Sequence, residues 1–121
     1  MSMIRVKTLT VQLIDAQPDR IRICRIDGES LVTLVVPRED LAEAKSLPNI
    51  PQRGVYYLLD EDHGNVSRVY AGQTTQGIAR LDAHKAKKEF WNKAVMFLDD
   101  DQNISRDALD VLEAKAIDYV R

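Results

Sequence analysis

Four side chains that could take part in phosphoryl chemistry follow one another in the middle of the chain. Tyr56 and Tyr70 carry phenols, Arg80 a guanidinium and His84 an imidazole. Cutting a phosphodiester requires an attacking water, a group that accepts its proton and positive charge beside the transition state. The planar fork of arginine matches phosphate oxygens, and a phenol becomes a usable base when a metal ion or a cation lowers its pKa. The set therefore predicts hydrolysis of a phosphodiester.

A carboxylate is added much later in the chain. Glu113 lies in a segment whose apolar residues recur at helical spacing, which predicts a final helix that begins near Ser105. One carboxylate, together with water and phosphate oxygens, is enough to hold Mg²⁺. We therefore expect one Mg²⁺ or Mn²⁺ ion at Glu113. In isolation, this residue would be interpreted as a surface carboxylate.

These residues resemble the GIY-YIG nuclease superfamily, which includes the N-terminal nuclease module of excision-repair endonucleases. Residues 54–56 (GVY) stand where the family has its GIY block, and residues 70–74 (YAGQT) stand where it has YIG and a small polar continuation. Arg80, His84 and Glu113 then follow in the family order. The resemblance covers a little over half of the chain, from residue 54 onward.

The resemblance implies a divalent-metal-dependent endonuclease that hydrolyses DNA. By that likeness Tyr56 is the candidate base and Tyr70 orients the water or the phosphate. Arg80 contacts the scissile phosphate, and Glu113 binds the metal ion. His84 matches a position one helical turn later that the family fills with tyrosine or histidine.

DNA contacts are expected from the second block and from a basic stretch after it. Gly72 would allow close backbone approach, and Gln73 follows it. Lys85, Lys87 and Lys88 form a local basic run, although the whole chain has a net charge of −2. Nonspecific DNA binders usually carry a surplus of positive charge. The charges alone leave open whether this run is a DNA-binding face or an ordinary solvated helix surface.

A second hypothesis is an interaction module that binds nucleic acid or protein and keeps the fold without efficient cleavage. The acidic net charge favours it. The family also has an asparagine downstream of the metal-binding glutamate, and this sequence ends at Arg121 without it. Either the chain is truncated or the residue is lacking, and we favour truncation. Outside the resemblance, Tyr56 would be interpreted as a core aromatic, and Arg80 with His84 as a solvated helix face.

Two regions with different patterns are expected. Apolar and polar residues alternate over 5–14 and 20–26, and a more apolar run covers 31–36, so three strands are predicted. A short helix over 38–47 and a linker at 48–51 follow. Residues 1–50 are thus predicted to form a small β-rich N-terminal lobe.

Residues 51–121 are predicted to form a GIY-YIG-like nuclease domain. A β-hairpin is expected over 55–60 and 66–71, then a helix over 72–89 and a strand over 91–98. On that helix, Ile78, Leu81 and Lys85 are expected to line the inner side. The predicted fold class is α+β, with a small three-stranded antiparallel sheet flanked by helices and preceded by the N-terminal lobe.

The composition favours a cytoplasmic protein with no membrane partner. The sequence has no apolar run of about 18 residues and no secretory signal. Cys24 is the only cysteine, so no internal disulfide can form. The oligomeric state is left open.

Overall fold

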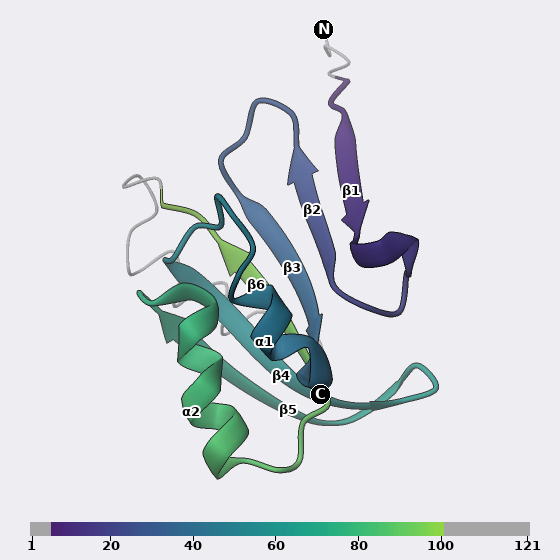
Figure 1. Cartoon of the computed structure of the whole chain (residues 1–121), viewed down its shortest axis with the longest axis vertical. Helices are drawn as coiled ribbons and strands as arrows, with labels where there is room; N and C mark the ends of the chain where they lie inside the picture. Colours follow the sequence, from purple (N-terminus) through teal and green to yellow (C-terminus); the bar gives the residue numbers. More distant parts are fainter. Residues whose placement is uncertain (1–5, 101–121) are drawn as a thin grey trace, which may run out of the picture.

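The computed structural model describes residues 6–100, which form one antiparallel sheet of six strands. The strand order across the sheet is β1-β2-β3-β6-β4-β5 (Figure 1). The strands are β1 (Leu9–Leu13), β2 (Arg22–Ile26), β3 (Val32–Pro37), β4 (Gly54–Asp62), β5 (Asn65–Thr74) and β6 (Lys93–Leu98). Every neighbouring pair is antiparallel.

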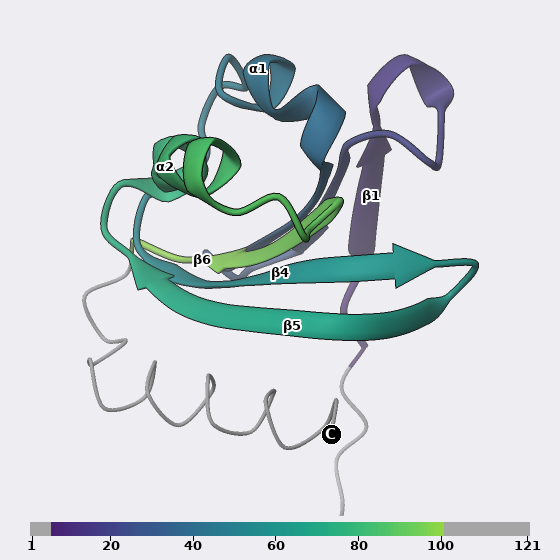
Figure 2. The ribbon, with the colours of Figure 1, turned by 90° about the horizontal axis from the view of Figure 1, so that it is seen from below.

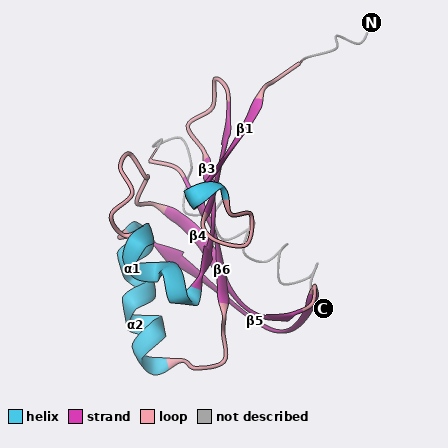
Figure 3. Ribbon diagram, turned by 45° about the vertical axis from the view of Figure 1, so that its right-hand side comes forward, coloured by secondary structure: helices cyan, strands magenta, loops and turns pink. Residues whose placement is uncertain are grey.

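Two short α-helices cover one face of this sheet. They are α1 (Leu41–Ala44) and α2 (Arg80–Lys87), and both lie above the same side of the strands (Figure 2). Three short 3-10 helices complete the described elements: η1 (Ile14–Ala16), η2 (Arg38–Asp40) and η3 (Gly77–Ala79). Figure 3 shows the strands as one continuous twisted layer beside the helices. No helix in the described part of the chain is both long and apolar enough to span a bilayer.

The prediction of a three-stranded sheet preceded by a separate lobe is wrong. Strands β5, β4 and β6 do lie side by side, but β3 continues the sheet on the other edge of β6. The register between β3 and β6 runs from Val32 opposite Leu98 to Pro37 opposite Lys93. The strands before residue 50 are therefore half of the same sheet. Separate roles for residues 1–50 and 51–121 remain a prediction.

The sequence of β6 explains why it lies inside the sheet. Ala94, Met96 and Leu98 are buried on the helix-covered face, while Val95 and Phe97 are half-buried on the other face. Its two edges pair with β3 and β4, and residues that are apolar on both faces suit such a central strand. The linker at 48–51 breaks the local pattern, but it does not prevent pairing between distant strands.

The hydrophobic core fills the space between the sheet and the two helices. Its most deeply buried side chains come from both halves of the chain: Ile21, Leu34, Leu41, Leu58, Leu81, Trp91 and Met96. Because the helices contribute to the same cluster as the strands, the core fixes the position of α2 over β4. That position decides where the residues of the candidate site lie.

The helix predicted over 72–89 is shorter than expected. Strand β5 continues through Thr74, whose Oγ1 accepts a hydrogen bond from the backbone N–H of Gln76 at 2.9 Å. Gly77 then has a φ of 60°, outside the right-handed helical region. Helix α2 therefore begins only at Arg80. The predicted helix at 38–47 is likewise limited to η2 and α1, and the final helix expected from Ser105 lies outside the described residues.

Candidate active site

Strands β4 and β5 place both tyrosines on the helix-covered face of the sheet. Tyr56 lies opposite Gly72, and Leu58 lies opposite Tyr70. Side chains two residues apart on a strand share a face, so the two tyrosines emerge on the same side. Tyr56 is buried, with 1% of its surface exposed, and Tyr70 is half-buried.

Helix α2 brings His84 against these two rings. The Tyr56 hydroxyl oxygen lies 2.6 Å from His84 Nε2. The ring centroid of His84 is 5.4 Å from that of Tyr56 and 5.1 Å from that of Tyr70, and the two tyrosine centroids are 6.5 Å apart. These three residues form one compact cluster, called the Tyr56–His84–Tyr70 cluster below. The sequence order therefore identified three side chains that the fold brings together.

Burial and nearby charges set the protonation of His84. Burial lowers its pKa below the ordinary value, and the positive charges of Arg80, Lys88 and Lys87 lower it further. A neutral imidazole has one ring nitrogen that can accept a hydrogen bond. At neutral pH the imidazole is therefore neutral, and the Tyr56 hydroxyl and His84 Nε2 share a hydrogen bond whose direction depends on the tautomer of the ring.

Gly72 allows the Tyr56 ring to lie directly against strand β5. A Cβ atom at position 72 would come within 2.5 Å of Tyr56 Cζ and Oη. Distances below about 3.0 Å to a Cβ atom require a neighbour to move. In the described structure the residue in close contact with Gly72 is thus the tyrosine ring. Contact between Gly72 and DNA stays a prediction.

Arg80 is the first residue of α2 and is exposed. It borders an open polar cavity of about 260 Å³ that is also lined by Gln73, Thr74, Thr75 and Gln76. Its charge contributes to the lowered pKa of His84, so the guanidinium lies within electrostatic reach of the cluster. Arg80 and His84 are four residues apart, yet one is exposed and the other buried. They do not form a common solvated face.

The three lysines after His84 lie along the outer side of α2 and just beyond it. Lys85 and Lys87 are exposed, so the prediction that Lys85 lines the inner side of the helix is wrong. His84 takes that inner position beside Leu81. Lys88 Nζ lies 4.6 Å from the centroid of the Tyr70 ring. The basic run is thus continuous with the edge of the cluster.

The metal ion expected at Glu113 finds no ready binding group in the described structure. Glu113 itself lies outside the described residues. Within residues 6–100, no three His, Cys, Asp or Glu side chains are grouped so that they could hold an ion.

A second cation–ring contact next to the cluster was not predicted. The Arg68 guanidinium lies 4.5 Å from the ring centroid of Phe90. Together with Lys88 over Tyr70, this contact joins strand β5 to the segment after α2. No sequence signal identifies either pairing, because each depends on how that segment folds back onto the strand.

Comparison of the chain with protein-family models, with curated proteins and with solved structures gave no match in any of the three.

Proposed function

We propose that this protein is a divalent-metal-dependent endonuclease that hydrolyses DNA phosphodiester bonds. The observation that carries the proposal is the 2.6 Å contact between the Tyr56 hydroxyl and His84 Nε2, with Tyr70 against the same imidazole. Arg80 stands at the start of the helix that carries His84. A phenol, an imidazole and a guanidinium together can move a proton and bind a phosphate oxygen.

The Tyr56–His84 pair would handle the proton of the attacking water. The water gives a proton to the Tyr56 oxygen as its own oxygen attacks phosphorus, and Tyr56 passes its original proton to His84 Nε2. The bond from phosphorus to the leaving oxygen breaks in the same displacement, and the leaving oxygen takes its proton from solvent water. The lowered pKa of His84 keeps the imidazole neutral at neutral pH and ready to accept that proton. Tyr70 would orient the water or the phosphate from its half-buried place beside His84.

Positive charge on α2 would bind the substrate backbone. Arg80 presents an exposed guanidinium beside the polar cavity, and its fork suits two phosphate oxygens. Lys85 and Lys87 would contact phosphates farther along the DNA strand. A bound divalent ion, with Glu113 as the proposed ligand, would add positive charge at the phosphate.

Plasmid nicking in Mg²⁺ or Mn²⁺ tests the proposal. The matched pair of variants is Tyr56→Phe and Tyr57→Phe, because the two tyrosines are neighbours on β4 but leave the sheet on opposite faces. We expect the wild type and Tyr57→Phe to nick and Tyr56→Phe to lose nicking. Equal nicking by all three would contradict the proposed site. DNA binding without nicking by the wild type would instead favour an interaction module.

A further inference from the structure

Arg38, the first residue of η2 after β3, contacts the end of helix α2. Its Nη1 donates hydrogen bonds to the carbonyl oxygens of Lys88 at 2.7 Å and Trp91 at 3.2 Å, and its Nη2 donates to that of Lys85 at 2.7 Å. The guanidinium carbon lies 4.7 Å from the centroid of the Trp91 ring. The backbone N–H of Arg38 also donates to the carbonyl of Asn92 at 2.9 Å.

One of these contacts, from Nη2 to the carbonyl of Lys85, satisfies a carbonyl group that α2 leaves unpaired in its last turn. The last turn of an α-helix has free carbonyls and a partial negative charge, and a cation there is stabilising. Arg38 supplies both hydrogen-bond donors and positive charge to the end of α2, which finishes at Lys87. It also holds the segment that leaves the helix, from Lys88 to Trp91.

The segment held by Arg38 touches the Tyr56–His84–Tyr70 cluster in two places. Lys88 Nζ lies over the Tyr70 ring, 4.6 Å from its centroid. Trp91 Nε1 donates a hydrogen bond to the carbonyl oxygen of His84 at 3.4 Å. Each of these two residues gives its own carbonyl to Arg38. Arg38 is therefore one contact away from both the tyrosine and the histidine of the cluster.

We propose that Arg38 is a positioning residue that holds His84 and Tyr70 in place beside Tyr56. Its role in catalysis rests on the proposed nuclease function, but its effect on the cluster does not. Arginine suits the role because its rigid fork presents several donors in one plane, which lysine cannot reproduce. A residue from the N-terminal half of the chain would thus belong to the machinery of the candidate site.

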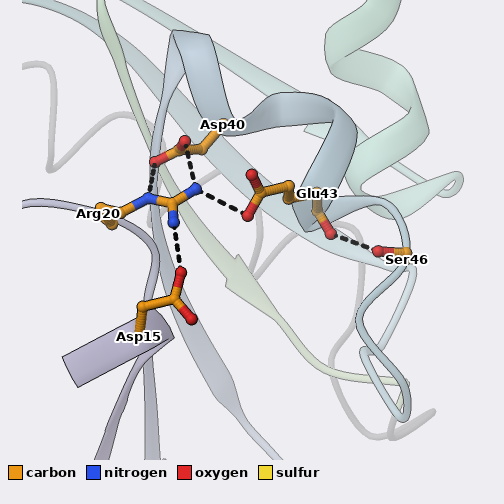
Figure 4. A network of polar contacts seen from close by, with 5 residues as sticks. All are labelled: Asp15, Arg20, Asp40, Glu43 and Ser46. Carbon is orange, nitrogen blue, oxygen red and sulfur yellow. Dashed lines mark hydrogen bonds and ion pairs between the residues drawn. The ribbon is translucent and has the colours of Figure 1, made fainter. Parts of the chain in front are cut away.

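Arg20 provides a matched control within the same half of the chain. Its guanidinium pairs with Asp15 at 2.7 Å, Asp40 at 3.0 Å and Glu43 at 2.7 Å (Figure 4). It is thus also an arginine with three partners outside α2 and the cluster, and one of them, Asp40, lies in η2 with Arg38. Replacing Arg20 removes a comparable set of contacts without touching the helix that carries His84.

The test is an NMR titration of the His84 imidazole in the full chain, carried out on the wild type, Arg38→Ala, Arg38→Lys and Arg20→Ala while all are folded. We expect Arg38→Ala to move the His84 ring signals and to raise its pKa towards the ordinary value of about 6.5, since a loosened helix end admits water. In Arg38→Lys the pKa of His84 should shift in the same direction by a smaller amount. This variant carries the test if Arg38→Ala does not fold. Arg20→Ala should leave the signals unchanged. The proposal would be overturned if the folded Arg38 variants kept the wild-type His84 signals and titration. It would also be overturned if Arg20→Ala shifted the His84 signals by as much as they do.

Nicking kinetics distinguish this inference from the proposed function. If the wild type cuts DNA, Arg38→Ala should lower kcat by about 10- to 100-fold with little change in KM, because the misplaced groups act on the reacting atoms. A rise in KM at constant kcat would contradict a positioning role. If the wild type cuts no DNA, the nuclease proposal fails, while the NMR comparison still decides whether Arg38 positions the cluster.

Discussion

The Tyr56 hydroxyl and His84 Nε2 lie 2.6 Å apart although the two residues are separated by 28 positions in the sequence. One comes from an inner strand of the sheet and the other from the helix packed on it. Both are buried, with 1% and 5% of their surfaces exposed. A buried polar group that loses its partner costs about 1–3 kcal/mol, so each residue of this pair depends on the other.

The first prediction concerns the stability of this pair. Tyr56→Phe and His84→Leu should each lower the free energy of unfolding by about 1–3 kcal/mol, because each leaves the other polar group without this partner. The double variant should cost less than the sum, since both hydrogen-bonding groups are then gone. Urea denaturation of the four proteins measures the coupling. Strictly additive costs would mean that the two groups do not interact in solution.

The second prediction is a pH dependence of stability that comes from His84. Its pKa is lowered in the folded state by burial and by Arg80, Lys88 and Lys87, so the unfolded chain binds the proton more readily. The contribution of His84 to the free energy of unfolding should therefore have its full value above about 6.5, the pKa of histidine in the unfolded chain. It should fall as the pH drops below that value. Urea denaturation from pH 7.5 down to pH 5 measures this fall.

His84→Gln should remove that part of the pH dependence. The sequence contains two histidines, so His63→Gln is the natural control. His63 is exposed in the turn between β4 and β5, and its replacement should leave the fall in place. If His63→Gln lost the pH dependence and His84→Gln kept it, the assignment of the pH dependence to His84 would be wrong.

The third prediction concerns the close contact at Gly72. Gly72→Ala puts a Cβ atom 2.5 Å from Tyr56 Cζ and Oη, so the ring must move. We expect a loss of about 1–3 kcal/mol, which is typical of overpacking, and altered NMR signals of His84. Gly28→Ala is the control, because Gly28 has a φ of 80° and open space around it. That control should cost stability without changing the His84 signals.

The fourth prediction concerns DNA affinity. Replacing Lys85 and Lys87 with alanine should weaken binding to all DNA sequences alike and reduce the slope of log K against log salt by up to about 1.8, or 0.9 for each lost phosphate contact. Fluorescence anisotropy with a labelled duplex at several salt concentrations measures this slope. Lys7→Ala, far from α2 in the chain and paired with Glu29, should leave it unchanged. Equal slopes for all three proteins would exclude the lysines as phosphate contacts.

The fifth prediction tests the single sheet. Leu34 on β3 is fully buried and lies opposite Met96 on β6. Leu34→Ala should lower the free energy of unfolding by about 2–5 kcal/mol. Trp91, the only tryptophan, reports this loss from the other half of the chain. If the two halves unfolded independently, the urea midpoint seen by Trp91 fluorescence would not change.

Local patterns in the sequence were enough to place the strands, but not to assemble the sheet. The hairpin of β4 and β5 follows from two apolar runs and the turn between them, and the order of Tyr56, Tyr70 and His84 identified side chains that do meet. The pairing of β3 with β6 joins residues about sixty positions apart and has no local signal. The contacts of Arg38 with the end of α2 are equally nonlocal.

The boundaries of α2 show the same limit on a smaller scale. The apolar spacing of Ile78 and Leu81 fitted a long helix, but the register with β4 extends β5 through Thr74. Pairing with a neighbouring strand therefore outweighed helical periodicity at residues 72–74. In the helix that forms, His84 lies on the inner side beside Leu81 and Lys85 is exposed.

The place of β6 has a consequence for how the chain is made. It is the last of the described strands to be synthesised, yet it lies between β3 and β4 in the finished sheet. Until residues 93–98 emerge from the ribosome, β3 and β4 each keep an edge with unpaired backbone groups, and such edges invite pairing with other chains. We expect ribosome-bound chains that end before β6 to need a chaperone, and chains that include it to pair the free edges of β3 and β4.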